Sequence, residues 1–229
     1  MTEPESDLTF MVHKALELGR YEDAVRFARQ LIQINPNLNH DQRIFLSSAY
    51  HEAVSRRRQD VLIISQCIEA TVEEAKKVKL VEIVNRVRAN IHDYCMDIIQ
   101  IANEILLPAA DSPITIVFYE EMKADYYRYD SEVQVGDLKI HSAQEAENCY
   151  KKALSIARDV IQPSHPVYLG IILNYCVFLV DIKNDINSAK IITQNAINQA
   201  SECEEQFKPD SEICVRLLQE NLEIWSEQI

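Results

Sequence analysis

Glycine is scarce in this chain of 229 residues, and its scarcity excludes one class of site. The three glycines, Gly19, Gly136 and Gly170, lie far apart. Loops that cradle the phosphates of a nucleotide need clustered glycines, because glycine combines positive φ angles with close approach of the backbone to the ligand. The sequence therefore has neither a dinucleotide-binding fingerprint nor a P-loop, and we do not expect chemistry driven by a nucleotide.

Paired cysteines and metal-ligand patterns are lacking as well. The six cysteines are widely spaced without a Cys-x-x-Cys pair, and the six histidines form no HExxH or related pattern. Neither a metal site nor a catalytic constellation is predicted, so we expect no cofactor and no enzymatic activity. Unpaired thiols, together with an acidic start unlike a secretory signal, place the protein in the cytoplasm, and the nucleus is a second possible compartment.

Positive charge is also in short supply. The chain has 36 acidic and 23 basic side chains and a formal net charge of −13, which argues against attraction to nucleic acid or to an anionic membrane. The longest apolar stretch, residues 168–180, contains Asn174 and is too short to span a bilayer. We therefore expect neither nucleic acid nor membrane as a partner, and any anionic ligand must be held locally.

Hydrophobic periodicity predicts an all-α fold. Apolar residues recur at spacings of three and four almost everywhere, while sustained alternation is rare. Breaks near Gly19, at 35–37, near Thr71, and at 108–113, 136–137, 163–166, 184–187 and 208–210 give about nine helices. Two helices are long, over residues 40 to about 70 and 78–107, and short turns predict antiparallel packing. A helical solenoid is the alternative, although no repeat register is sustained.

Four strings of residues carry a resemblance to a known family. They are RIFLSSAY at 43–50, DYYRY at 125–129, HPVYLG at 165–170 with LNYCVF at 173–178, and LLQENLEIW at 217–225. In order and spacing across nearly the whole chain, they resemble 14-3-3 proteins. The resemblance implies one domain over residues 1–229, with nine antiparallel helices in a cup-shaped protomer around a concave peptide groove. Residues 1–73 would dimerise and form part of the groove, and residues 78–229 would supply the remaining helices.

The resemblance implies a non-enzymatic adaptor that binds phosphoserine or phosphothreonine peptides of client proteins in signal transduction. Arg58, Arg128 and Tyr129 match the family's phosphate ligands, and guanidinium groups offer paired charge-assisted hydrogen bonds to a phosphate. Three consecutive arginines point in three directions, and the resemblance selects Arg58 over Arg56 and Arg57. Chemistry alone favours ordinary solvated arginines paired with neighbours such as Asp125. The resemblance reverses that preference and makes Asp125 an orienting carboxylate.

The remaining groove residues also follow from the resemblance. Amides such as Asn174 and Asn221 can donate to and accept from a peptide backbone, and apolar side chains on the same helices would form a hydrophobic wall. The implied peptide-groove residues are His51, Glu121, Asp125, Leu173, Asn174, Val177, Asp181, Leu217, Asn221 and Trp225. A structural alternative stays open, in which Asn174 is a satisfied core amide and the apolar side chains are ordinary core.

Three positions depart from the family pattern. His51 and Glu121 stand where lysines are expected, and Leu62 stands where an arginine is expected. A groove of reduced positive charge predicts weaker or narrower binding of phosphopeptides. The same departures favour an alternative function, a phosphate-independent helical scaffold that binds acidic or hydrophobic peptides.

A homodimer is the family's usual assembly. The residues implied at the interface are Arg20, Tyr21, Asp23 and Arg86. Asn90 stands where the partner of Arg20 should be acidic, and Lys14 occupies a position that is often apolar. These departures favour a weakened or rearranged dimer, and a solvated surface is the alternative.

Overall fold

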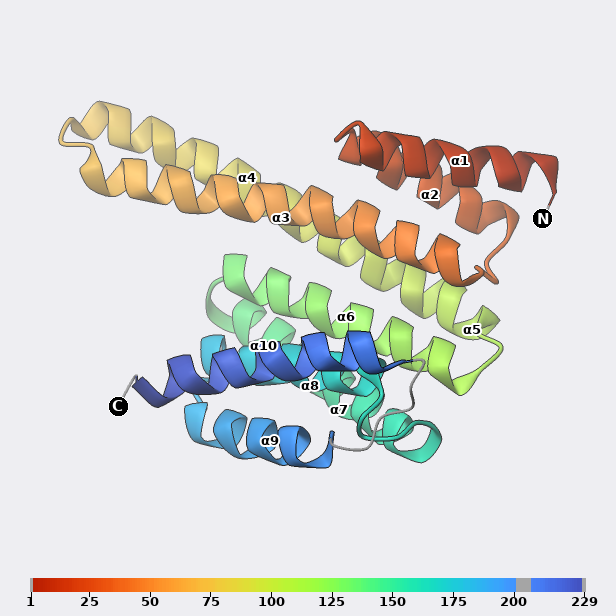
Figure 1. The fold of residues 1–229 in the computed structure, drawn as a ribbon. Helices are drawn as coiled ribbons and strands as arrows, with labels where there is room; N and C mark the ends of the chain where they lie inside the picture. Colours follow the sequence, from red (N-terminus) through yellow and green to blue (C-terminus); the bar gives the residue numbers. More distant parts are fainter. Residues whose placement is uncertain (1, 201–206, 228–229) are drawn as a thin grey trace. The chain divides into compact units, whose positions relative to one another are not determined.

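The computed structural model describes residues 2–200 and 207–227, and every regular element in these ranges is a helix (Figure 1). The elements are α1 (Glu3–Glu17), α2 (Tyr21–Ile34), α3 (His40–Ala70), α4 (Glu74–Ile101), the π-helical turn η1 (Ala102–Leu106), α5 (Leu107–Ala109), α6 (Pro113–Val133), α7 (Gly136–Val160), α8 (Pro166–Asp181), α9 (Ile186–Gln199) and α10 (Lys208–Glu227). Because α4, η1 and α5 follow one another without a gap, the described residues form nine helical rods. The predicted all-α class and the predicted number of helices are confirmed.

The two long predicted helices are present, with one revised boundary. The first coincides with α3, whereas the second begins at Glu74 and not at Val78. Residues 74–77 carry no large apolar side chain, so apolar periodicity did not reveal them, but an acidic side chain in the first turn favours a helix start. At the other end, η1 brings the amide of Leu107 to the carbonyl of Ala102, and this wider turn lets the helix continue through Pro108.

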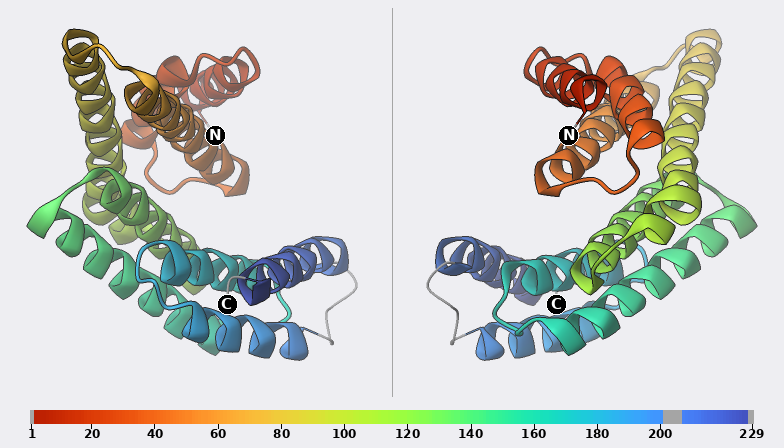
Figure 2. Two further views of the ribbon diagram at one scale, coloured as in Figure 1. Left: turned by 90° about the vertical axis from the view of Figure 1, so that its left-hand side faces the viewer. Right: turned by 90° about the vertical axis from the view of Figure 1, so that its right-hand side faces the viewer.

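The helices form two compact units, which we call unit 1 (Met1–Asp111) and unit 2 (Ser112–Ile229). In unit 1, α1 packs on α2 and α3, and α3 packs on α2 and α4. In unit 2, α7 packs on α6 and α8, and α10 packs on α8 and α9. Figure 2 shows α6 and α7, drawn in greens, side by side. The division expected between residues 73 and 78 falls at the turn between α3 and α4, inside unit 1.

A buried carboxylate, that of Glu5, connects the first three helices of unit 1 through hydrogen bonds. Glu5 Oε1 accepts hydrogen bonds from Asn35 Nδ2 at 2.9 Å and Gln42 Nε2 at 3.1 Å, and these bonds lower the pKa of Glu5. Gln42 also closes a capping box with Asn39, since the two residues exchange backbone-to-side-chain hydrogen bonds of 3.0 and 2.9 Å. The start of α1, the end of α2 and the start of α3 are thereby held together.

Unit 2 contains a second buried acid, Glu120 on α6. Its carboxylate oxygens lie 3.1 Å from Lys123 Nζ and 2.7 Å from Lys152 Nζ on α7. Burying a charge costs free energy unless the charge is paired. The two lysines therefore offset the cost of burying the Glu120 carboxylate. The surrounding core is apolar and aromatic, with the ring of Tyr150 at 5.6 Å from the rings of both Tyr175 and Phe178.

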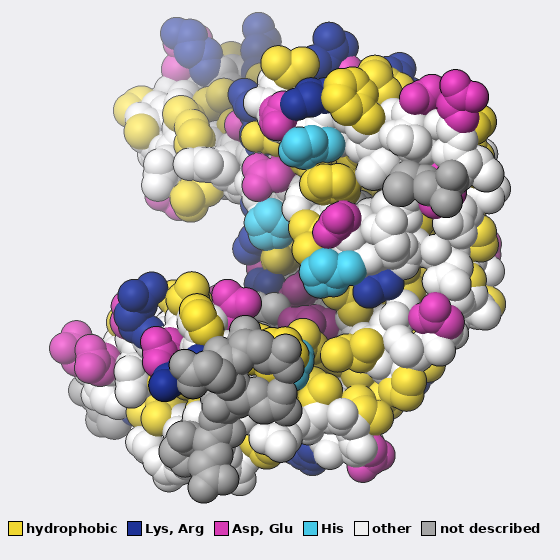
Figure 3. Space-filling model, turned by 45° about the vertical axis from the view of Figure 1, so that its right-hand side comes forward, with side chains coloured by type: hydrophobic (Ala, Val, Ile, Leu, Met, Phe, Trp, Pro, Cys, Tyr) yellow, Lys and Arg dark blue, Asp and Glu magenta, His cyan; other side chains and the backbone are white. Residues whose placement is uncertain are grey.

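The surface of the described ranges is mixed in charge and polarity. On the face drawn in Figure 3, acidic side chains are scattered among hydrophobic and neutral ones, and basic side chains occur singly or in small groups. Within residues 2–200 and 207–227, no helix combines the length and apolarity needed to cross a membrane. No cluster of His, Cys, Asp and Glu suited to a metal ion occurs there. Five cysteines are free thiols, and Cys203 lies outside the described residues.

Candidate functional site

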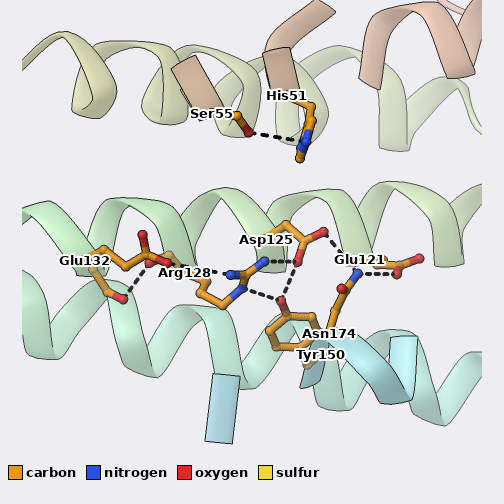
Figure 4. Close-up of polar contacts among 9 residues, drawn as sticks. His51, Ser55, Glu121, Asp125, Arg128, Glu132, Tyr150 and Asn174 are labelled. Atoms are coloured by element: carbon orange, nitrogen blue, oxygen red, sulfur yellow. Dashed lines mark hydrogen bonds and ion pairs between the residues drawn. The ribbon is translucent and has the colours of Figure 1, made fainter. Parts of the chain in front are cut away.

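A stripe of charged side chains runs along one face of α6. Glu121, Asp125, Arg128 and Glu132 follow one another at spacings of four, three and four residues, which places them on neighbouring turns (Figure 4). The helix that carries them is capped by Ser112, whose Oγ accepts a hydrogen bond from the Thr115 amide at 3.3 Å. The stripe is therefore built on a rigid element of unit 2.

Arg128 is the cation of this stripe, and it is buried, with 8% of its surface exposed. Its Nη2 donates to Asp125 Oδ1 at 3.3 Å, its Nε donates to the Tyr150 hydroxyl at 3.2 Å, and its Nη1 lies 3.6 Å from Glu132 Oε1. Burial lowers the pKa of Arg128, but the interactions with Tyr150 and Asp125 outweigh burial and leave this pKa well above its usual value. The guanidinium is held in place and fully charged.

Tyr129 lies beside this guanidinium. The Cζ atom of Arg128 lies 4.5 Å from the centre of the Tyr129 ring, and Tyr126 packs edge-on against the same ring. Tyr129 is itself buried. The two residues predicted to bind phosphate in unit 2 are therefore in direct contact.

Tyr150 on α7 joins Asp125 to Arg128, and sequence reasoning did not single it out. Its hydroxyl donates to Asp125 Oδ1 at 2.5 Å while it accepts from Arg128 Nε. The partners of Tyr150 lie 25 and 22 residues away in the chain, so no local spacing could reveal the contact. Glu132 was also missed, although its spacing of four residues from Arg128 was a visible signal.

Asn174 on α8 reaches across to the same stripe. Its Nδ2 donates to Glu121 Oε1 at 3.2 Å and to Asp125 Oδ2 at 3.4 Å. Because carboxylate oxygens accept hydrogen bonds, the amino end of the amide must face them. The carbonyl oxygen of Asn174 has no hydrogen-bond partner within the described part of the chain, and it is free to accept one from a peptide.

Glu121 differs from the other acids of the stripe. It is half-buried, its one hydrogen bond comes from Asn174, and it forms no ion pair with any described residue. Burial and, next, the negative charge of Asp125 raise the pKa of Glu121 to about 8, against the opposing effect of Asn174. Helix α8 passes close to this carboxyl group at Gly170. A Cβ atom added to Gly170 would lie 4.0 Å from Glu121 Oε1.

In unit 1, α3 separates the three consecutive arginines as expected from helix geometry. Arg57 pairs with Glu22 at 2.7 Å, donates to the carbonyl of Ala53 at 2.8 Å and lies over the ring of Tyr94. Arg56 is exposed, whereas Arg58 is half-buried. Arg57 is thus committed to contacts within unit 1, and Arg58 points in another direction.

The departures from the family pattern in α3 are both accessible. His51 is exposed, and its Nε2 lies 3.3 Å from Ser55 Oγ one turn later. Leu62 has 59% of its surface exposed. The surface of α3 therefore presents an imidazole and an isobutyl group where two cations were expected.

The remaining predicted groove residues lie on α8 and α10. Leu173 and Val177 are half-buried on either side of Asn174, and Asp181 is exposed at the end of α8. On α10, Leu217 is exposed, Asn221 is half-buried and Trp225 is buried in the core of unit 2. The structure thus brings Glu121, Asp125, Arg128 and Asn174 into one network, and it places no α10 residue in that network.

The predicted interface residues lie on the surface of unit 1. Asp23 Oδ2 lies 2.5 Å from Arg20 Nη2, and Asp23 Oδ1 lies 2.7 Å from Arg26 Nη2. Tyr21 lines a shallow pocket of about 420 Å³ together with Ile63, and Arg86 is exposed on α4.

Comparison with known proteins identifies the family. The family model for 14-3-3 proteins matches residues 11–226. The chain is 32% identical to 14-3-3 protein beta/alpha of Homo sapiens over 100% of this chain and 95% of the relative. It is 31% identical to 14-3-3-like protein 2 of Caenorhabditis elegans, over 99% and 93%, and 32% identical to 14-3-3 protein 3 of Entamoeba histolytica, over 99% and 97%. The chain therefore belongs to the 14-3-3 family.

Proposed function

We propose that this protein binds phosphoserine- or phosphothreonine-containing peptides of client proteins and regulates those clients as an adaptor. Its membership of the 14-3-3 family supports a phosphopeptide-binding role, since the members of that family are adaptors and not enzymes. The proposed phosphate ligands are Arg58 on α3, and Arg128 and Tyr129 on α6.

The observation that carries the proposal is the state of Arg128. A guanidinium group has five N–H donors, and Arg128 uses two of them in hydrogen bonds, to Asp125 and Tyr150. The Nη1 edge is left for a ligand, with Glu132 near it at 3.6 Å. A buried arginine that is already oriented loses little side-chain entropy when a phosphate binds, and charge-assisted hydrogen bonds to a phosphate are strong.

Asn174 supports the extended peptide that the proposal requires. Its amino group is held by Glu121 and Asp125, so its unpartnered carbonyl oxygen can accept a backbone N–H. Leu173 and Val177 flank it on α8 and offer apolar surface to the side chains of the peptide. We further propose that binding is weaker than in a groove with its full set of cations, because Glu121 and Leu62 replace two of them.

Calorimetry with a phosphoserine peptide and its unphosphorylated twin tests the proposal. We expect only the phosphorylated peptide to bind, with affinity reduced about tenfold or more by Arg58→Ala and by Arg128→Lys, which keeps the charge but removes the planar fork. Arg56→Ala, an exposed arginine two residues from Arg58, is the matched control and should leave affinity unchanged. Equal binding of the two peptides would contradict the proposal, and so would retention of affinity in both variants.

A phosphate-independent scaffold is the second candidate, and two observations favour it. Leu62 is mainly exposed, and Glu121 adds an acid to the site in place of a cation. On this alternative, Arg58 and Arg128 would meet carboxylates of an acidic peptide. A third peptide, with glutamate in place of the phosphoserine, separates the candidates, because a scaffold would bind it as tightly as the phosphopeptide.

We also propose a homodimer formed by unit 1, as family membership supports in general. Leu18, at the end of α1, has 73% of its surface exposed and lies next to Arg20 and Tyr21. An exposed leucine beside the predicted interface residues suits an apolar contact with a second copy. Since Asp23 is already paired with Arg20 and Arg26 within the chain, less of its charge is available to a partner.

A further inference from the structure

Two adjacent acids on α6 are held in different ways. Glu120 is buried, and its carboxylate is paired with Lys123 and Lys152. Glu121 is half-buried, forms no ion pair with a described residue, and accepts a single hydrogen bond, from the neutral amide of Asn174. An acid away from water keeps its charge only when a cation or several donors compensate that charge. Glu121 has neither within the described part of the chain.

A like charge next to Glu121 adds to this effect. Asp125 lies one turn further along α6, and Asn174 Nδ2 donates to both carboxyl groups, at 3.2 Å to Glu121 and 3.4 Å to Asp125 (Figure 4). Burial and then the charge of Asp125 raise the pKa of Glu121 to about 8, against the opposing hydrogen bond from Asn174. In most molecules at pH 7, Glu121 is therefore a neutral acid, which carries a proton that it can donate.

Glu121 and Asn174 together present a donor and an acceptor. Glu121 Oε1 accepts from Asn174 Nδ2, and Glu121 Oε2 has no hydrogen-bond partner among the described residues. The proton of the neutral acid therefore belongs on Oε2, where it is available to a ligand. The carbonyl oxygen of Asn174 is likewise without a partner in residues 2–200 and 207–227, because its amino group faces the two acids. A hydroxyl donor on α6 thus stands beside a carbonyl acceptor on α8.

This pair matches one edge of an extended peptide. In an antiparallel pair of strands, the N–H and C=O of one residue point to the same side, and the facing residue accepts from the first and donates to the second. Neutral Glu121 and Asn174 offer the same two groups from their side chains. An ionised Glu121 would instead place two acceptors side by side, and the carbonyl of the peptide would face a negative charge. Only the neutral acid is complementary to the peptide backbone.

Resting on the proposed function, we propose that Glu121 binds the backbone of a phosphorylated client as a neutral carboxylic acid and donates a hydrogen bond to a peptide carbonyl group. Asn174 accepts the N–H of the same peptide residue, so the two side chains hold one residue of the client by both of its backbone groups. This contact does not depend on the client's side chains, and it is lost when Glu121 ionises. Clients should consequently bind more tightly near pH 7 than in mildly alkaline solution.

The dependence of affinity on pH tests this assignment. Calorimetry at pH 7, 8 and 9 uses two phosphoserine peptides of unrelated flanking sequence and their unphosphorylated twins, all acetylated and free of histidine and cysteine. We expect the affinity of both phosphopeptides for the wild type to fall about tenfold from pH 7 to pH 9, because the neutral fraction of Glu121 falls from about nine-tenths to about one-tenth. The second pKa of phosphoserine is about 6, so the peptide itself does not cause the decrease.

The other titratable groups around Glu121 belong to three helices. Asp125 lies on α6, and Cys214 lies on α10, where burial raises the pKa of its thiol above the usual value. On α7, the hydroxyl of Tyr150 bonds to Asp125, and burial raises the pKa of Tyr150 well above its usual value. Helix α8 brings the amide of Asn174, which does not titrate. The thiol and the phenol thus stay protonated over most of the tested range, and variants of Glu121 isolate its own contribution.

Two substitutions of Glu121 separate its proton from its charge. Glu121→Gln carries an amide donor at every pH, so its affinity should not depend on pH. Glu121→Leu is also uncharged but has no donor, and it should bind the phosphopeptides about three- to tenfold more weakly than Glu121→Gln at pH 7 and pH 9 alike. Asp159→Asn, which removes one negative charge from an exposed position on α7 of the same unit, is the matched control and should keep the wild-type pH dependence. Circular dichroism and thermal unfolding establish that each variant is folded.

Proton uptake gives an independent readout of the same contact. At pH 8.5 the wild type should take up protons when it binds a phosphopeptide, as measured in buffers of different ionisation enthalpy, and Glu121→Gln should take up fewer. A wild-type affinity that is constant from pH 7 to pH 9, or that falls equally in Glu121→Gln, overturns the inference while the phosphopeptide function stands. Equal affinities of the glutamine and leucine variants overturn it as well. If the phosphorylated peptides bind no better than their unphosphorylated twins, both proposals fall.

Discussion

At the residue scale, Asp125 organises the site in unit 2. Its two oxygens connect Arg128 and Tyr150 to Asn174, so the proposed phosphate ligand and the proposed backbone anchor share one carboxylate. Such a network restricts the rotamers of all its members, and preorganisation of this kind lowers the entropic cost of binding. Asp125 therefore acts on Arg128 as a positioning residue.

Glu121 should make the protein less stable as pH rises. Its pKa is about 8 in the folded protein and near 4.5 when solvated, so the folded state binds more protons between those values. Stability then falls as pH increases from about 5 to about 8.5 and levels off beyond that. We expect the loss, about 2 kcal/mol for a half-buried group, to disappear in Glu121→Gln.

Urea unfolding of wild type and Glu121→Gln at pH 6 and pH 9 measures this effect. Comparing the two proteins at each pH cancels the titration of other groups, and Asp159→Asn controls for the loss of one negative charge. A stability difference between wild type and Glu121→Gln that is the same at both pH values would show that the carboxyl group of Glu121 titrates normally.

At the scale of single helices, the start of α3 determines how unit 1 is assembled. Its capping box joins Asn39 to Gln42, and Gln42 then reaches Glu5 on α1. The cap therefore stabilises a helix and also orients a side chain that holds a neighbouring helix. The helix stabilised by this cap, α3, also carries His51 and Arg58.

Asn39→Ala should destabilise unit 1 by about 1 kcal/mol, because the amide of Gln42 loses its side-chain acceptor. Asn39→Asp keeps an acceptor at the cap and should be nearly neutral. Chemical denaturation of the two variants beside the wild type gives the comparison. Equal stability of the alanine and aspartate variants would mean that the cap contributes nothing measurable.

At the scale of the whole molecule, the proposed function draws on both units. On this proposal, unit 1 would supply Arg58 and the surface for a second copy, and unit 2 would supply Arg128, Tyr129 and Asn174. Because a homodimer would carry two copies of the peptide site, it could bind two phosphorylated segments of one client with increased avidity.

Leu18→Asp should weaken the proposed dimer at least about tenfold in Kd, because a carboxylate would replace an apolar contact. Val72→Asp is the matched control, since Val72 is 98% exposed at the turn between α3 and α4. Light scattering over a range of protein concentrations measures the assembly. If the wild type stays monomeric at all concentrations, or if both variants behave as the wild type does, the proposed interface is wrong.

The sequence by itself determined the all-α class, most helix boundaries and the candidate residues. Apolar periodicity, proline and glycine are local signals, and they placed α3 at residues 40–70 correctly. The π-helical turn before Pro108 and the early start of α4 escaped the same reasoning, because backbone hydrogen bonds and polar first turns leave little trace in hydrophobic patterns.

Tertiary structure alone decided how the candidate residues act on one another. Local spacing related Asp125 to Arg128, but the contacts of Tyr150 and Asn174 with α6 join residues 22 to 53 positions apart. Likewise, Glu120 and Glu121 are the same amino acid in adjacent positions, yet Glu120 is paired with two lysines and Glu121 forms no ion pair with a described residue. The packing of α7 and α8 on α6 determines these differences, because the environment of a charge depends on which side chains neighbouring helices bring to it.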